Sequence, residues 1–209
     1  MLLKFAGILG CYLAGSIPSG YWMVKMARGI DIREHGSKNI GFTNVLRVCG
    51  PVLGIPVFLL DILKGAAPVF LIVHIFPGHA LFHVICAAAC LVGHSWSCFL
   101  GFRGGKIVAT SLGVFLILKW EAVLISALVF VIIFLVVRIV SVGSLAAALT
   151  IVGVQLVELG GFPGWAPSPE VFVFSVLAVT LIFVKHRENI RRLLSGEEKR
   201  LAVGKGNPS

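Results

Sequence analysis

Charged residues are scarce in this 209-residue chain, and acidic residues are the scarcer kind. Asp and Glu number 9 against 18 Lys and Arg, and all charged residues make up only 13% of the sequence. A soluble domain usually carries about 25% charged residues. With 58% hydrophobic residues and a mean hydropathy of +1.01, the composition argues against a soluble domain and favours a membrane protein. The length predicts one domain, residues 1–209.

Features of three other classes of protein are also missing. The number of cysteines is odd and most lie in apolar runs, which argues against a disulfide framework. The net charge of +9 does not indicate nucleic-acid binding, because the basic residues stand in short gaps between apolar runs. The first apolar run is longer than the core of a signal peptide, and no convincing cleavage site follows it. The cysteines are Cys11, Cys49, Cys86, Cys90 and Cys98.

Seven apolar runs predict an all-α integral membrane protein with seven transmembrane helices, since a span needs about 20 apolar residues. The fourth run is short: about 12 helical residues cover roughly 18 Å. We therefore expect its glycine-rich start to lie below the membrane surface, among other helices. Pro18, Pro56 and Pro68 are expected to kink spans. The runs lie at about 2–26, 52–76, 81–100, 107–118, 122–137, 141–159 and 171–184.

The basic residues predict the sidedness of these spans. If all seven runs cross, 15 of the 18 Lys and Arg fall on one side, and Lys4, Lys64 and Lys119 are the other three. Cytoplasmic loops carry the Lys and Arg excess. The N-terminus is thus expected outside and the C-terminus in the cytoplasm. We expect the basic tail 185–209 to lie on the inner leaflet, with disorder at its end, residues 204–209.

Polar residues inside the apolar runs admit structural explanations. Asp61 and Lys64 are three residues apart, so they can pair with each other, and a structural and a functional role are equally open. Histidines and cysteines recur on one face of the third run, but His83 and His94 are about 16 Å apart along a helix. That separation is too large for one ion. We expect no metal site and no cofactor.

Two polar stretches suit an anion such as phosphate. The first is the loop 31–47, which is rich in glycine, hydroxyl, amide and cationic side chains; these donate hydrogen bonds and let backbone N–H groups approach an anion. Its candidate residues are Gly36, Ser37, Asn39, Thr43, Asn44 and Arg47. The second runs from His94 to Gly104-Gly105-Lys106 at the start of a helix, where the helix dipole adds partial positive charge. It is not a Walker A loop, because Leu100 and Ile107 stand where that motif needs glycine and Ser or Thr.

Two further stretches fall on the same predicted side. One holds Ser141 and Ser144, which can also be read as helix-capping serines. The other begins at His186, which shares a helix face with Asn189, while Glu188 and Arg192 are spaced to form a pair. Each stretch alone can be an ordinary polar turn. The gathering of all four on one side points to a shared phosphate-binding site at the cytoplasmic face.

These four stretches, with Gly15-Ser16-Ile17-Pro18-Ser19-Gly20, resemble the bacterial membrane-embedded acyl-phosphate:glycerol-3-phosphate acyltransferases, the PlsY family. The resemblance covers nearly the whole chain. Two positions depart from it: Lys38 stands where the family's GSGN motif has glycine, and Ile107 where GGKG has glycine. Ile107 raises the prospect of a changed loop conformation, and Lys38 adds a cation.

The resemblance implies an enzyme of the bacterial inner membrane with its active site facing the cytoplasm. It implies that an acyl group moves from acyl phosphate to the sn-1 hydroxyl of glycerol 3-phosphate, the first step of phospholipid synthesis. Membrane lipids surround the protein, and no nucleic acid and no obligatory protein partner are expected. The implied catalytic residues are Ser37, Arg47, Lys106, His186 and Asn189. The residues expected to bind substrate or phosphate are Gly36, Asn39, Thr43, Asn44, His94, Gly104, Gly105 and Ser144.

Two other functions compete with this interpretation. A transporter for a small anion is one, but transporters usually bind near the midplane and often show repeats, whereas these donors gather at one face. A non-catalytic membrane subunit is the other. The His-x4-Asp signature of the other glycerolipid acyltransferases is absent, since none of the six histidines has Asp five residues later.

Overall fold

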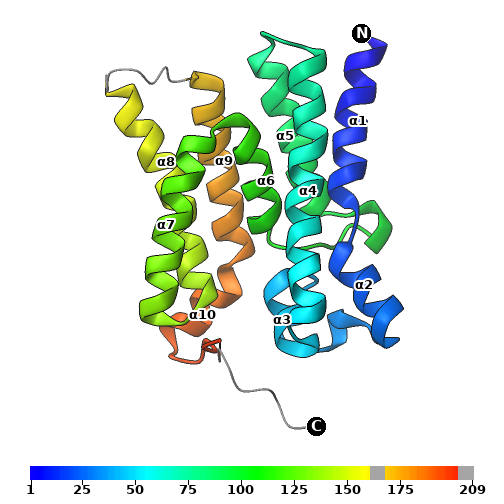
Figure 1. The fold of residues 1–209 in the computed structure, drawn as a ribbon, viewed down its shortest axis with the longest axis vertical. Coiled ribbons are helices and arrows are strands. Elements are labelled where there is room, and N and C mark those ends of the chain that lie inside the picture. Colours follow the sequence, from blue (N-terminus) through cyan, green and yellow to red (C-terminus); the bar gives the residue numbers. More distant parts are fainter. Residues whose placement is uncertain (161–167, 202–209) are drawn as a thin grey trace.

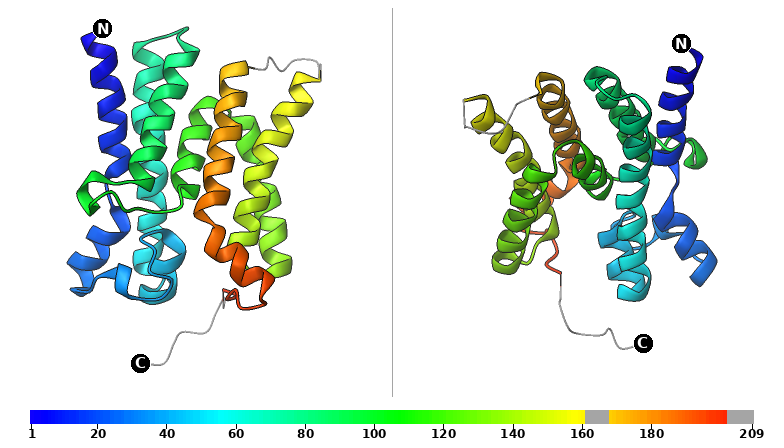
Figure 2. Two further views of the ribbon diagram at one scale, coloured as in Figure 1. Left: turned by 180° about the vertical axis from the view of Figure 1, so that it is seen from behind. Right: turned by 45° about the horizontal axis from the view of Figure 1, so that its top comes forward.

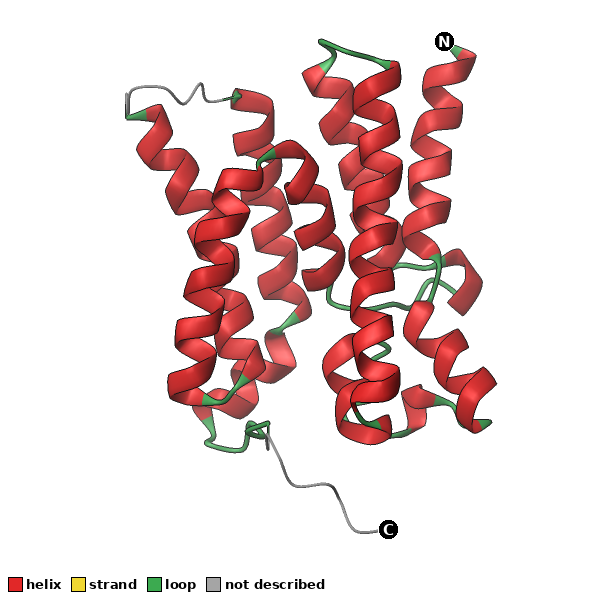
Figure 3. Ribbon diagram, in the orientation of Figure 1, coloured by secondary structure: helices red, strands yellow, loops and turns green. Residues whose placement is uncertain are grey.

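The computed structural model describes residues 1–160 and 168–201, and this part of the chain contains helices and no β-strand (Figure 3). The all-helical prediction is therefore confirmed for the described residues. The elements in chain order are α1 (Leu2–Ser16), α2 (Ser19–Arg28), the 3₁₀ turn η1 (Ile32–Glu34), α3 (Phe42–Cys49), α4 (Pro51–Ile75), α5 (Ala80–Ser95), the 3₁₀ turn η2 (Cys98–Leu100), α6 (Val108–Leu118), α7 (Trp120–Val137), α8 (Val140–Leu159), α9 (Pro169–Lys185) and α10 (Arg187–Leu194).

Four helical segments of the described chain are long and apolar enough to cross a membrane. They are Leu2–Arg28, Pro51–Ile75, Trp120–Val137 and Val140–Leu159. A fifth is present if α9 and α10, bent by 58° at their junction, count as one span. The helices α5 and α6 are apolar but shorter, with 16 and 11 residues. Each predicted run thus corresponds to a helix, while the crossing of all seven stays a prediction.

The helices form two groups that meet along α6 and between α5 and α9 (Figures 1 and 2). Helices α1, α4 and α5 form one group, and α7, α8 and α9 form the other. The N-terminus lies at one end of the bundle, whereas α2, α3, α10 and the turn between α7 and α8 lie at the opposite end. The segment 96–107 lies between the two ends, beside the middle of α4, which is the depth expected for the glycine-rich start of the short fourth run.

The kink expected at Pro18 is present: the first run breaks after Ser16 and its helix resumes at Ser19, because Pro18 lacks the N–H that would continue it. Other predicted boundaries were wrong. The third run ends at Ser95 rather than residue 100. The loop 31–47 contains most of a short helix, α3. In contrast, α4 continues through Pro56 and Pro68. Residues 202–209 of the predicted tail, with its expected disorder, lie outside the described residues.

A buried ion pair stabilises the break between α1 and α2. Lys64 Nζ lies 2.7 Å from Asp61 Oδ1 and donates a second hydrogen bond, of 2.7 Å, to the carbonyl oxygen of Ile17. That carbonyl belongs to the break, where the helical hydrogen bond is missing, and it also accepts a 3.1 Å hydrogen bond from the Ser19 N–H. Two donors thus replace the helical one, as irregular backbone inside a membrane requires. The predicted pairing of Asp61 with Lys64 is thus confirmed, and the contact to Ile17 gives it a structural role.

Glycines bring α4 and α6 into close contact. A Cβ atom at Gly65 of α4 would collide with the carbonyl oxygen of Thr110, and one at Gly113 of α6 would collide with that of Ile62. Helices in membranes pack through such small residues, because there is no hydrophobic driving force between apolar helices in lipid. This contact fixes α6, and therefore the polar segment that precedes α6, against the long helix α4.

We expect Gly113→Ala to lower the free energy of unfolding by about 1–3 kcal/mol, because the added methyl group overpacks the contact with α4. Thermal unfolding of the purified protein in detergent measures the change. Gly153→Ala on α8 is the matched control. No atom lies within 4 Å of a Cβ built at Gly153, so alanine there is expected to be neutral or to stabilise the helix by up to about 1 kcal/mol. Equal stability of the two variants would contradict the packing argument.

Candidate functional site

The glycines before α6 are packed against His94. The Gly105 N–H donates a 3.0 Å hydrogen bond to the His94 carbonyl oxygen. A Cβ at Gly104 would collide with that same oxygen, and one at Gly105 with His94 Nε2. His94 Nδ1 lies 3.0 Å from Thr110 Oγ1. The structure therefore places His94, predicted to bind phosphate, as the buried support of the Gly104-Gly105 turn.

Ile107 has a left-handed backbone, with φ of +57°. A β-branched residue there carries strain of about 1–2 kcal/mol, whereas glycine adopts this conformation freely. The Ile107 side chain is fully buried in the largest apolar core, and loss of such a side chain costs about 2–5 kcal/mol. Burial therefore outweighs the strain. Ile107 keeps a backbone conformation that glycine would also adopt, so the departure does not require a new loop shape.

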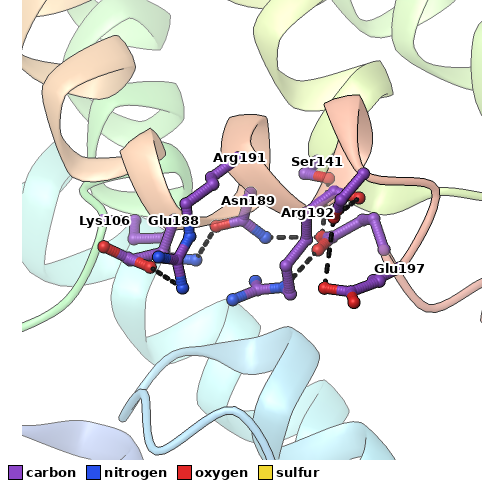
Figure 4. A network of polar contacts seen from close by, with 9 residues as sticks. Lys106, Ser141, Glu188, Asn189, Arg191, Arg192 and Glu197 are labelled. Atoms are coloured by element: carbon purple, nitrogen blue, oxygen red, sulfur yellow. Dashed lines mark hydrogen bonds and ion pairs between the residues drawn. The ribbon is translucent and has the colours of Figure 1, made fainter.

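A chain of hydrogen bonds joins three separate segments at this site (Figure 4). Lys106 Nζ donates to Asn189 Oδ1 on α10. Asn189 Nδ2 donates to Glu198 Oε1 at 2.5 Å, and Ser141 Oγ, on α8, donates to the same oxygen at 2.9 Å. Arg192 Nε donates to Glu198 Oε2 at 2.7 Å. Residues 106, 141, 189 and 198 thus meet although they are far apart in the sequence.

Cations crowd Lys106 and alter its ionisation. Burial lowers the pKa of Lys106 to about 8, and the positive charges of Arg192 and Arg47 lower it as well, while Glu198 works in the opposite direction. Arg47 belongs to α3, whose segment lies below the polar network in Figure 4. Two predicted catalytic residues, Arg47 and Lys106, therefore lie close enough for their charges to interact.

His186 lies at the junction of α9 and α10 and is 4% exposed. Its Nδ1 is 2.8 Å from the carbonyl oxygen of Ile182, so Nδ1 carries the proton and Nε2 is left as an acceptor. Burial and, to a smaller extent, the charge of Lys106 lower the pKa of His186 to about 4 although the hydrogen bond to Ile182 works to raise it, so the ring is neutral at pH 7. His186 therefore belongs to the same electrostatic environment as Lys106.

The first loop owes its shape to Asn44. Asn44 Oδ1 accepts a 2.7 Å hydrogen bond from the Ser37 N–H, and Nδ2 donates to the carbonyl oxygens of Asn39, His35 and Ile32 at 2.8, 3.0 and 3.3 Å. These contacts use the donors of the Asn44 amide, which is 1% exposed. Asn44, predicted to bind substrate, is thus placed as the internal support of the loop.

Other predicted residues of this loop have similar roles or remain open to a ligand. Asn39 Oδ1 accepts a 2.9 Å hydrogen bond from the Gly41 N–H, and a Cβ at Gly36, which has φ of +60°, would collide with Asn44 Oδ1. Both residues shape the turn. Ser37 and Arg47 are exposed, and Thr43 is half-buried on the first turn of α3.

Glu198 escaped the sequence analysis, and Ser141 and Arg192 were named there but not expected among the site residues. Ser144, the expected serine, is buried on α8, but Ser141 one turn earlier is the one bonded to Glu198. The predicted pairing of Glu188 with Arg192 was wrong. Glu188 instead lies 3.5 Å from Arg191, while Arg192 pairs with Glu198. The spacing within α10 gave no signal of this, because the partner lies in the folded-back tail.

The fold and the site together define a membrane-embedded helical protein with a cationic polar cluster between its helices. The model of the family described as "Glycerol-3-phosphate acyltransferase" matches residues 5–196. The chain therefore belongs to the glycerol-3-phosphate acyltransferase family.

Relatives and solved structures agree with this assignment. The glycerol-3-phosphate acyltransferase of Myxococcus xanthus is 45% identical over 90% of this chain and 95% of that protein. That of Anaeromyxobacter sp. strain Fw109-5 is 46% identical over 92% and 93%. The crystal structure of PlsY (YgiH), an integral membrane glycerol 3-phosphate acyltransferase, in its glycerol 3-phosphate form is similar with a TM-score of 0.88 and 36% identity, covering 95% of this chain and 96% of that one.

The lysophosphatidic acid form of the same protein is similar with a TM-score of 0.85, covering 95% of both chains. The resemblance to the PlsY family that the motifs predicted is thus confirmed. The chain is an acyltransferase of the PlsY type, and the transporter and subunit interpretations are set aside.

Lys38, the second departure from the family motif, is exposed and also left-handed, with φ of +58°. Unlike Ile107 it buries no apolar side chain to offset the strain. We expect Lys38→Gly to raise the free energy of unfolding by about 1 kcal/mol, because glycine removes the Cβ strain. Lys38→Ala removes the same charge but keeps the strain, so it should give no such gain. Thermal unfolding in detergent measures both, and equal gains would show that charge rather than backbone strain matters.

Proposed function

We propose that this acyltransferase uses acyl phosphate as donor and acylates the sn-1 hydroxyl of glycerol 3-phosphate, giving lysophosphatidic acid and phosphate. One observation carries the proposal: Lys106 meets Asn189, Arg192 and the charge of Arg47 at one polar cluster. Both substrates carry phosphate, and a cluster of ammonium and guanidinium groups within a low-dielectric bundle favours such anions strongly.

The proposed reaction needs no covalent intermediate on the enzyme. The hydroxyl oxygen of glycerol 3-phosphate attacks the carbonyl carbon of acyl phosphate, a new ester C–O bond forms, and the bond from the carbonyl carbon to the phosphate oxygen breaks. Inorganic phosphate leaves with the bonding pair. Lys106 and Arg47 are assigned the role of stabilising that developing charge, and Asn189 that of holding Lys106 in place. Ser37, which is exposed, is assigned the role of a hydrogen-bonding group that contacts the substrate.

A substrate phosphate is the better base for the hydroxyl proton. The pKa of His186 is lowered to about 4 by burial, whereas a phosphate monoester has a second pKa of about 6. The phosphate therefore holds a proton more readily near neutral pH. We assign neutral His186 the role of a hydrogen-bond acceptor, through Nε2, in the polar cluster.

The membrane arrangement that goes with this proposal has seven crossings, with the polar end of the bundle in the cytoplasm of a bacterial cell and the protein in its inner membrane. Exposed apolar side chains occur along the long helices, which suits contact with lipid, and the acyl chain would lie among them. The chain would act as a single domain without an obligatory protein partner.

The purified protein in detergent should release phosphate only when glycerol 3-phosphate and acyl phosphate are both supplied. Lys106→Ala and Arg47→Ala should each lower activity by about 10²–10³-fold, because each removes a positive charge that stabilises the leaving phosphate. Lys25→Ala is the control: Lys25 is exposed on α2 and donates to the Gly29 carbonyl oxygen, outside the cluster. Phosphate release with a single substrate, or full activity in both site variants, would refute the proposal.

The pH dependence of the rate tests the charge on Lys106. A lysine whose pKa is about 8 is protonated below that pH and neutral above it, so activity should fall as pH rises through about 8. Lys106→Arg keeps a positive charge at all working pH values, and its alkaline fall should disappear even if its maximal rate is lower. Ionisation of the substrates affects the wild type and Lys106→Arg equally, so a difference between their pH profiles comes from residue 106. An unchanged alkaline fall in Lys106→Arg would assign the fall to another group.

A further inference from the structure

Glu198 lies two residues beyond the stretch that the family model matches, yet its carboxylate stands in the middle of the polar cluster. It accepts hydrogen bonds from Ser141, Asn189 and Arg192, which come from α8 and α10. We propose that Glu198 is a positioning residue for the acyl transfer: it fixes the side-chain amide of Asn189, and through it the ammonium group of Lys106. This inference rests on the proposed function.

The polarity of the contacts explains why a carboxylate is needed. An ionised carboxylate only accepts hydrogen bonds and an ammonium group only donates them, while an amide does one at each end. Glu198 on one side and Lys106 on the other therefore permit a single orientation of Asn189, with Nδ2 toward Glu198 and Oδ1 toward Lys106. Without the carboxylate the amide can turn over and present its donors to the ammonium group.

The backbone holds Glu198 in place. Residues 196–201, here called the C-terminal strap, fold back over α10: the N–H groups of Glu197 and Glu198 donate to the carbonyl oxygen of Arg192 at 2.8 and 3.1 Å. The Leu201 N–H donates to the carbonyl oxygen of Arg138, in the turn between α7 and α8, at 2.8 Å. The strap thus ties α10 to the start of α8, and Glu198 bridges the same two elements with its side chain.

The charges around Lys106 give Glu198 a second, measurable effect. Lys106 faces Arg47 from α3, His186 and Arg192 from the α9–α10 segment, and Glu198 from the strap. Burial works to raise the pKa of Glu198, but the hydrogen bonds from Asn189, Arg192 and Ser141 outweigh it and hold that pKa below its ordinary value. Glu198 is therefore ionised at pH 7, and its negative charge offsets the nearby cations in favour of protonated Lys106.

A competing role for the same carboxylate is that of an internal anion which occupies a phosphate position and is displaced by substrate. The geometry favours positioning, because Glu198 is bonded to Asn189, Ser141 and Arg192, whereas Lys106 is engaged by Asn189. A carboxylate that imitated the phosphate would be expected to engage the ammonium group itself. The two roles predict opposite changes in the rate when the charge is removed.

The decisive variant is Glu198→Gln, which keeps the size of the side chain and removes its charge. We expect kcat to fall about tenfold or more with a small change in KM, because the amide and the ammonium group lose their fixed geometry. The alkaline fall in activity should also move to lower pH, because Lys106 loses its favourable charge. Glu197→Gln is the matched control: Glu197 is exposed and accepts a hydrogen bond from Ser195 Oγ, and neither quantity should change.

A double-mutant cycle separates positioning from a general structural effect. If Glu198 acts through Asn189, Glu198→Gln should reduce kcat in the wild type but add little to Asn189→Ala, whereas independent effects multiply. Thermal unfolding of each variant checks that it is folded. Wild-type kcat and pH profile in Glu198→Gln, a rise in activity with a lower KM, or multiplicative losses in the cycle would each overturn the positioning role. Failure of the proposed function shows instead as a wild-type protein without activity on the two substrates.

Discussion

A lysine ammonium group held between helices needs polar partners that do not come from water. Lys106 has them: Asn189 accepts its hydrogen bond, and Glu198 offsets the charges of Arg47 and Arg192 around it. An ionisable residue within a membrane bundle is costly, and its partners are brought to it by the fold. In this chain they come from α10 and the C-terminal strap, so these two segments must meet the start of α6 at one depth.

Short and broken helices make that meeting possible. Helix α6 has only 11 residues, so the segment that precedes it enters the bundle. The segment fits because Gly104 and Gly105 have no side chain to collide with His94, and α6 is held against α4 through Gly65 and Gly113. Elsewhere the break at Pro18 leaves the Ile17 carbonyl group without its helical hydrogen bond, and Lys64 and the Ser19 N–H donate to it instead. Each irregular stretch of backbone therefore has a specific polar or close-packed partner, as a membrane requires.

The sequence predicted the helical segments well because hydrophobic run length is the strongest signal a membrane protein carries. It also predicted Lys106, Asn189, His186 and Arg47 as site residues, because these belong to motifs with local spacing, and the structure brings them close together. It did not reveal α3, which forms from a stretch that reads as a polar loop. It missed the pairing of Arg192 with Glu198, since that contact depends on the backbone turn of residues 196–198. Asn44 and His94 were predicted to bind substrate or phosphate, and in the structure both also support the backbone around them, a role that sequence alone does not reveal.

The balance of charge at the site fits the reaction proposed for it. Lys106, Arg47 and Arg192 contribute three positive charges, Glu198 one negative charge, and neutral His186 none, so these groups carry a net charge of two positive. A phosphate monoester carries about −1.5 to −2 at pH 7, so the net charge of these groups balances about one phosphate group. In acyl transfer from acyl phosphate, negative charge builds on the leaving phosphate as the bond between the acyl carbon and the phosphate oxygen breaks. A fixed positive charge that balances about one phosphate group, held in a low-dielectric bundle, stabilises that developing negative charge. The proposed reaction therefore needs neither a metal ion nor a covalent intermediate.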